Sequence, residues 1–173
     1  IATIFVISNV DLIMANATQA VISSATATSD IPIVGTSVTD YVTTGTVKSN
    51  DAPGGNVTGT SDLAPIDQQV ELLQKLVPDA KNVGILYCSA EANSVYQAEQ
   101  AQKYLEKAGI TAKTYTAADS NDIQQVVTKA ADENDAIYIP TDNTIASNME
   151  IVKNVTVPAK VVSPMRASDT MQA

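Results

Sequence analysis

Short runs of apolar and β-branched residues alternate along this chain with longer segments whose apolar side chains recur at helical spacing. Runs of the first kind predict β-strands, and segments of the second kind predict α-helices. The predicted strands are residues 12–15, 31–34, 56–60, 83–87, 112–116, 136–139 and 160–162. The predicted helices are residues 64–77, 91–108 and 120–132, with a fourth after Asn143. Such an alternation is typical of an α/β fold in which parallel sheets are flanked by helices.

The number of strands predicts two lobes. Three predicted strands precede residue 61 and four follow it, whereas a doubly wound sheet has about five strands with helices on both faces. We therefore expect a partial amino-terminal lobe over residues 1–60, with its first strands preceding Ile1. A crossing near Ser61 and Asp62 would lead into a carboxy-terminal lobe over residues 61–173, which lacks its last segment.

Composition excludes several classes of protein. The 173 residues are 45% hydrophobic and 17% charged, which describes a globular chain able to bury a core. The net charge of -9 argues against a nucleic-acid partner, because binding to phosphates requires clustered Lys and Arg. No apolar run reaches the roughly 20 residues that span a bilayer, so no integral membrane segment is expected.

The chain has no histidine and a single cysteine, Cys88. An intrachain disulfide, the usual zinc sites and nucleophiles activated by histidine are therefore excluded. Cys88 ends an apolar run without a basic neighbour in the sequence, which indicates a small buried residue and not a reactive thiol. We expect no metal and no cofactor.

Small polar residues follow several of the predicted strands, where ligands bind in a parallel α/β sheet. The candidate ligand-binding residues are Asn16, Ala17, Thr18, Thr39 and Asp40 in the first lobe, Asp62 at the crossing, and Glu91, Asn93, Ser94, Thr141, Asp142 and Asn143 in the second lobe.

Two of these groups suit the two charges of an amino acid. Free amides at the start of the helix that follows Asn16 and Ala17, together with the Thr18 hydroxyl, suit a carboxylate. Asp142 with Asn143 follows an uncharged strand, where a carboxylate can pair with an ammonium group. The same residue types also cap helices and turns, so each position has a purely structural interpretation as well.

Seven segments in a fixed order carry a resemblance to a known family. They are residues 11–18, 30–34, 38–40, 53–59, 82–87, 91–94 and 140–144. The succession resembles the ABC-transporter substrate-binding protein family that includes tryptophan- and tyrosine-binding members. The resemblance implies two Rossmann-like lobes of periplasmic-binding-protein type I, joined by a hinge and closing on a small ligand. The tail departs from the pattern: residues 154–158 form a short connection before the last predicted strand, and residues 163–169 match no expected segment.

The function implied by the resemblance is capture of a small amino-acid-like ligand without chemical change, with an aromatic amino acid as the family-based expectation. The protein would be a monomer outside the cytoplasm, periplasmic or lipid-anchored, with its signal segment outside this chain. It would deliver the ligand to a membrane ABC permease. Two alternatives stay open: a doubly wound enzyme that uses Asp142 or Glu91 as a general acid or base, and the effector-binding domain of a sugar-responsive regulator.

Overall fold

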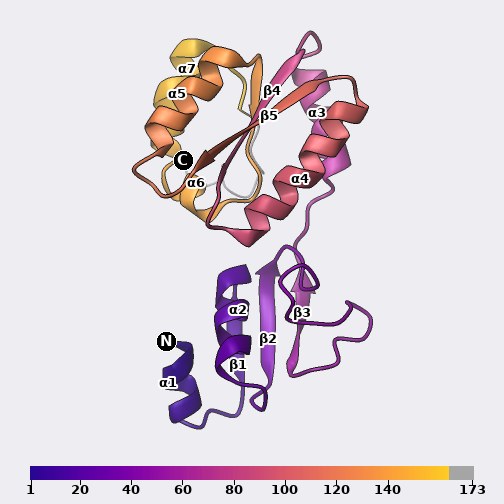
Figure 1. Ribbon diagram of the computed structural model, residues 1–173, viewed down its shortest axis with the longest axis vertical. Coiled ribbons are helices and arrows are strands. Elements are labelled where there is room, and N and C mark those ends of the chain that lie inside the picture. The colour runs from indigo at the N-terminus through magenta and orange to yellow at the C-terminus, as the bar shows by residue number, and fades with distance from the viewer. Residues whose placement is uncertain (164–173) are drawn as a thin grey trace. The chain divides into compact units, whose positions relative to one another are not determined.

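The structure is a computed structural model that describes residues 1–163, and the chain divides into two units, Ile1–Ala64 and a second unit that begins at Pro65 (Figure 1). Each unit has its own parallel three-stranded sheet. The predicted fold class, parallel sheets flanked by helices, is confirmed. Residues 164–169, part of the tail that matches no expected segment, lie outside the described residues.

The first unit contains a sheet in the order β1-β2-β3. Its elements are α1 (Ala2–Ile7), β1 (Ile13–Asn16), α2 (Thr18–Ala27), β2 (Ile33–Val38) and β3 (Val57–Ser61). The predicted strands agree with these to within a few residues, but α1 was not predicted. Ile1, Ile4 and Ile7 are exposed, so this helix presents no buried apolar face that periodicity could have revealed.

The core of the first unit lies on one face of its sheet. Ile13 and Ala15 of β1 are buried with Val21 of α2, whereas the intervening Met14 is 72% exposed. This alternation is typical of a strand with one covered face. Tyr41, from the helix-free connection between β2 and β3, is buried in the same cluster.

Two glycines let Tyr41 approach the sheet. Gly35 of β2 and Gly59 of β3 are register partners. A Cβ atom at Gly59 would lie far inside contact distance of the Gly35 carbonyl oxygen and of the Tyr41 Oη atom. The Tyr41 hydroxyl donates a hydrogen bond to the Thr60 carbonyl oxygen at 3.2 Å. The absence of a side chain at Gly59 therefore permits this close packing.

We expect Gly59→Ala to lower the free energy of unfolding by about 1 to 3 kcal/mol, because a backbone carbonyl cannot move away as a flexible side chain can. Gly55→Ala is the matched control, since a Cβ atom there meets nothing within 4 Å. Urea unfolding of both variants measures the difference. Equal stability of the two would contradict the packing argument.

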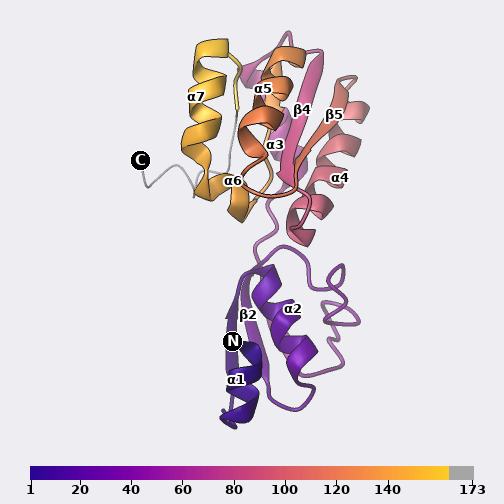
Figure 2. The same ribbon diagram turned by 60° about the vertical axis from the view of Figure 1, so that its left-hand side comes forward.

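The second unit contains a sheet in the order β5-β4-β6. Its elements are α3 (Ile66–Leu76), β4 (Asn82–Cys88), α4 (Ala92–Lys107), β5 (Thr111–Ala117), α5 (Ile123–Glu133), β6 (Ala136–Tyr138), α6 (Asn143–Ser147) and α7 (Met149–Ala159). Helices α3 and α4 cover one face of this sheet, and α5 and α7 cover the other (Figure 1, Figure 2).

The central strand β4 is buried on both faces. Val83 and Ile85 pack in the cluster with α3 and α4, whereas Leu86 packs in the cluster with α5 and α7. A strand covered on both faces has no reason to alternate apolar with polar residues. The continuous apolar run in the sequence is therefore explained by helices on both sides.

The carboxy-terminal elements differ from the prediction in three ways. Residues 160–162 do not form a strand; Val162 makes only an isolated bridge with Ala136. Residues 154–158 are not a connection, because they belong to α7, where Val152 and Thr156 continue its buried face. The predicted fourth helix is divided at Asn148 into α6 and α7. Helix α7 continues through Pro158 and ends at Ala159, so these residues extend the helix and do not link it to a strand.

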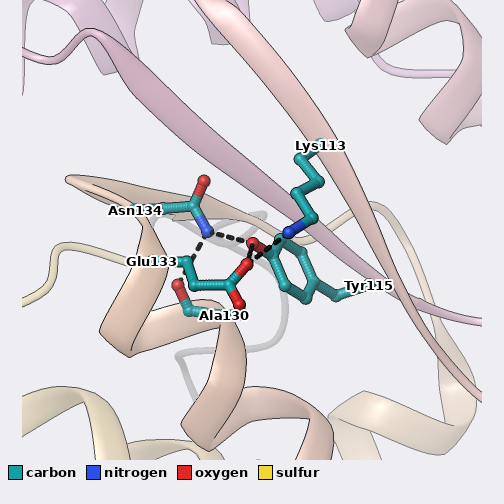
Figure 3. Close-up of polar contacts among 5 residues, drawn as sticks. All are labelled: Lys113, Tyr115, Ala130, Glu133 and Asn134. Carbon is teal, nitrogen blue, oxygen red and sulfur yellow. Dashed lines mark hydrogen bonds and ion pairs between the residues drawn. The ribbon is translucent and has the colours of Figure 1, made fainter.

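A polar cluster joins the edge strand β5 to the end of α5 (Figure 3). Glu133 forms an ion pair with Lys113 and accepts a hydrogen bond from the Tyr115 hydroxyl at 2.7 Å. The Asn134 amide nitrogen donates to the same hydroxyl at 2.8 Å and to the Ala130 carbonyl oxygen at 2.8 Å. The hydroxyl of the buried Tyr115 on β5 thus hydrogen-bonds to both Glu133 and Asn134 at the end of α5.

Tyr115→Phe should lower the free energy of unfolding by about 1 to 2 kcal/mol, because it removes the hydroxyl that bonds Glu133 and Asn134. Tyr104→Phe, on α4, is the control, since Tyr104 is 38% exposed and removal of its hydroxyl should change the free energy of unfolding little. Thermal denaturation of both proteins provides the comparison, and a similar midpoint for the two would rule out a stabilising role for the cluster.

Candidate functional site

In the first unit, the turn from β1 to α2 leaves the start of a helix open. The N-cap residue of α2 is Ala17, with φ 76° and ψ 156°, and no side chain caps the helix. The Ala20 and Val21 amides donate to the Ala17 carbonyl oxygen, so the first-turn amides of Thr18 and Gln19 point out of the helix end. A positive φ at a residue other than glycine is a strained conformation, which marks a constrained turn.

Thr18 adds a hydroxyl to this helix end. Thr18 as a whole is 4% exposed, and its side chain forms no hydrogen bond with the described residues. The neighbouring candidate Asn16 is exposed at the end of β1. The predicted group Asn16, Ala17 and Thr18 therefore lies at one helix end, where the Thr18 and Gln19 amides and the Thr18 hydroxyl have no acceptor within residues 1–163.

The remaining candidates of the first unit hold its last turns together. The Thr39 carbonyl oxygen accepts from the Ser61 hydroxyl at 2.8 Å, and the Asp62 amide donates to the Val38 carbonyl oxygen at 2.9 Å. Asp40 caps a turn by accepting from the Thr43 amide at 2.8 Å. At the exit of β2, therefore, the backbone groups of Thr39 and Asp62 and the side chain of Asp40 bond within the first unit.

In the second unit, Glu91 joins two loops that are far apart in the sequence. Its carboxylate accepts hydrogen bonds from the amide and the side chain of Asn143, at 3.0 and 2.8 Å. It also accepts from the amide and the hydroxyl of Thr144, at 2.8 and 2.7 Å, and from the Asn93 side chain at 3.3 Å. A glutamate before α4 thereby caps the first amides of α6.

Asp142 completes the cap of α6. One carboxylate oxygen accepts from the Ile145 amide at 2.8 Å, and the other accepts from the Cys88 amide at 2.7 Å. Asp142 is only 1% exposed. The side chain therefore links the end of β4 to the start of α6 from inside the unit. Cys88 is 2% exposed, which confirms the prediction of a small buried residue.

The backbone of Thr141 is fixed by three side chains of α4. Its carbonyl oxygen accepts from Asn93 at 2.9 Å and from the Ser94 hydroxyl at 3.3 Å, and its amide donates to Gln97 at 3.3 Å. The sequence reasoning missed Gln97 and Thr144. Gln97 lies four positions after Asn93 on one helix face, which is a spacing that brings side chains together.

The two carboxyl groups at this edge differ in their ionisation. Burial acts to raise the pKa of Glu91, but hydrogen bonds from Thr144 and Asn143 outweigh it and leave this pKa below its usual value. Burial dominates at Asp142 and raises its pKa, although the Cys88 and Ile145 amides oppose the rise. Glu91 is therefore an ionised acceptor at neutral pH.

Residues 1–163 contain neither a helix that is long and apolar enough to cross a membrane nor a group of three His, Cys, Asp or Glu residues placed to hold a metal ion.

Over its whole length, residues 1–173, the chain matches the family model of the ABC transporter substrate-binding proteins. The chain belongs to this family. The resemblance in the sequence is thereby confirmed.

Relatives of this substrate-binding chain include proteins named for aromatic amino acids. A tyrosine-binding protein of Clostridioides difficile (strain R20291) is 40% identical over 169 residues, which are 98% of this chain and 48% of that protein. The solved ABC domain in complex with L-Trp from Streptococcus pneumonia is 39% identical, with a TM-score of 0.93 over 97% of this chain and 59% of that chain.

A conserved domain protein from Vibrio cholerae has a solved structure that is 39% identical, with a TM-score of 0.90 over 94% of this chain and 55% of that chain. The substrate-binding chain thus spans about half the length of the curated relative that it matches. The high TM-scores confirm the α/β fold of the family.

Asp142→Ala in this substrate-binding chain should lower the free energy of unfolding by about 2 to 4 kcal/mol, because two buried amides lose their acceptor. Asp67→Ala is the control: Asp67 is an exposed carboxylate near the start of α3 that accepts a hydrogen bond from the adjacent Gln68 amide. Chemical denaturation measures both. A loss below about 1 kcal/mol for Asp142→Ala would show that its capping bonds contribute little.

Proposed function

We propose that this protein is the extracytoplasmic solute-binding component of an ABC importer, and that its small-molecule ligand is an aromatic amino acid. Membership of the family supports the role in transport. The tyrosine-binding relative and the relative solved with L-Trp support the ligand class. Delivery of the ligand to a membrane permease is part of this proposal.

The observation that carries the proposal is the open amino end of α2. Two free amides and the hydroxyl of Thr18, a residue that is 4% exposed, form a set of donors, and the helix dipole adds about half a positive charge there. A carboxylate is the ligand group that such donors suit. We propose that the ligand carboxylate binds here, with Asn16 and Ala17 shaping the turn.

The candidates of the second unit are proposed to divide into two groups. Glu91, Asn93, Ser94 and Asp142 already bond to protein groups. We propose that they hold the edge of the sheet in shape, while the ionised Glu91 carboxylate keeps the local potential negative and favourable to an ammonium group. Thr141 and the exposed Asn143 are proposed to contact the ligand.

The proposal includes no chemical conversion of the ligand. A general acid or base works best when its pKa lies near the operating pH, whereas the hydrogen bonds of Glu91 lower its pKa and use its oxygens. Asp142 is 1% exposed and bonds to two backbone amides, which leaves it poorly placed to exchange a proton with a ligand. No observation favours the alternative of a sugar-responsive regulator.

The family resemblance also predicts a monomer whose two units close on the ligand. In such a mechanism the ligand shifts the equilibrium towards the state that contacts it more extensively. Neither point is needed for the carboxylate assignment, which rests on the first unit alone.

Thr18→Val should weaken binding of L-tryptophan or L-tyrosine by about tenfold, because it removes one hydroxyl donor and preserves the shape of the side chain. Thr26→Val on the same helix is the control, since the Thr26 hydroxyl bonds to the Ile22 carbonyl oxygen on the exposed surface. Calorimetric titration of the intact protein measures the affinities.

Tryptamine, which lacks the carboxylate, should bind the wild-type protein more weakly than L-tryptophan. Equal affinities of Thr18→Val and the wild type for both amino acids would contradict the assignment of the carboxylate to α2. Failure of the wild type to bind either amino acid would contradict the proposed ligand class.

A further inference from the structure

Near opposite ends of β4, the carboxylates of Glu91 and Asp135 each accept hydrogen bonds from a pair of backbone amides. Asp135 precedes β6 and accepts from the backbone amides of Lys81 and Asn82, at 2.9 and 2.8 Å, at the start of the strand. Glu91 follows the strand and accepts from the backbone amides of Asn143 and Thr144, at 3.0 and 2.8 Å. Each carboxylate thus fastens the chain near β4 to the chain near β6.

The contacts of Glu91 account for every first-turn amide of α6 that Asp142 leaves free. Asp142 takes the Ile145 amide with its side chain and the Ala146 amide with its carbonyl oxygen. Glu91 takes the amides of Asn143 and Thr144, and it also holds both of their side chains. The position of residues 143 and 144 therefore depends on a side chain that reaches them from the β4–α4 loop.

Glu91 also sets the face that Asn143 presents. The Asn143 side-chain nitrogen donates one of its two N–H groups to Glu91 at 2.8 Å, so this bond fixes the direction in which the second N–H group and the amide oxygen point. Without Glu91, the same side chain could turn and present these groups in another direction.

We propose that Glu91 is a positioning residue, which fixes the turn of residues 141–144 and orients the Asn143 amide without touching the ligand. This inference rests on the proposed function for its effect on affinity, but its structural part stands on the hydrogen bonds of Glu91 alone. It differs from the sequence prediction, in which Glu91 contacts the ligand directly.

The test compares Glu91→Gln with Asp135→Asn in the intact protein. Each change preserves the size of the side chain and replaces one acceptor oxygen by an amide nitrogen. Both variants should therefore unfold at a lower temperature than the wild type. Only Glu91→Gln should weaken binding of L-tryptophan or L-tyrosine, by about tenfold, whereas Asp135→Asn should stay within about twofold.

Hydrogen exchange followed by mass spectrometry gives the second measurement. In Glu91→Gln, exchange should accelerate in peptides that contain residues 143–147, because two amides lose part of their acceptor. In Asp135→Asn, faster exchange should appear at residues 81 and 82 instead. Thr144→Val combined with Glu91→Gln should weaken binding by less than the product of the two single effects, because both remove the same contact.

Three results would overturn the inference: unchanged exchange at residues 143–147 in Glu91→Gln, unchanged affinity in that variant, or an equal loss of affinity in both variants. If the wild type binds neither amino acid, the proposed function fails. The exchange measurement then still decides whether Glu91 holds the turn.

Discussion

Burial of β4 on both faces is the constraint on which the second unit depends. A strand between two layers of helices can contact water only near its ends, so polar groups in the loops must satisfy the backbone there. Asp135 does this at one end, and Asp142 does it at the other by accepting from the Cys88 amide. The acidic residues beside this sheet are therefore structural acceptors first.

This requirement explains why the carboxyl edge of the second unit contains so few unused polar groups. Side chains of α4 hydrogen-bond to the backbone of Thr141, and the carboxylates of Glu91 and Asp142 accept from amides at the start of α6. The turn at residues 141–144 is therefore held by hydrogen bonds from several elements. A turn fixed in this way loses little further conformational freedom on binding, which would favour the ligand contacts that we propose for it.

The first unit follows a different arrangement. Its sheet has one buried face, and no side chain caps the first turn of α2. The strained Ala17 turn leaves helix donors uncovered, which costs stability unless a ligand or water accepts from them. The start of α2 has no side-chain cap, whereas the start of α6 is capped by Asp142 and Glu91. This difference is the structural basis of the different roles that we propose for the two edges.

The sequence by itself determined the alternation of strands and helices, the separation of the strands into two groups, and the positions along the chain where polar residues gather. These features depend on local periodicity and on residues that end helices, which a single chain displays directly. It also determined the family, because seven ordered segments carried the resemblance. It did not reveal α1, whose exposed isoleucines give no buried face, nor the continuation of α7 through Pro158.

Only the tertiary structure decided the roles of the site residues. Glu91 and Asn143 are 52 positions apart, and Asp142 and Cys88 are 54 apart. No local pattern indicates which distant amide a carboxylate will accept from. The residue types that cap a helix are also those that bind an amino acid, so the sequence supplied the candidates. Parallel pairing of β4 with β6 then brought the loops together and decided which protein groups these side chains bond to.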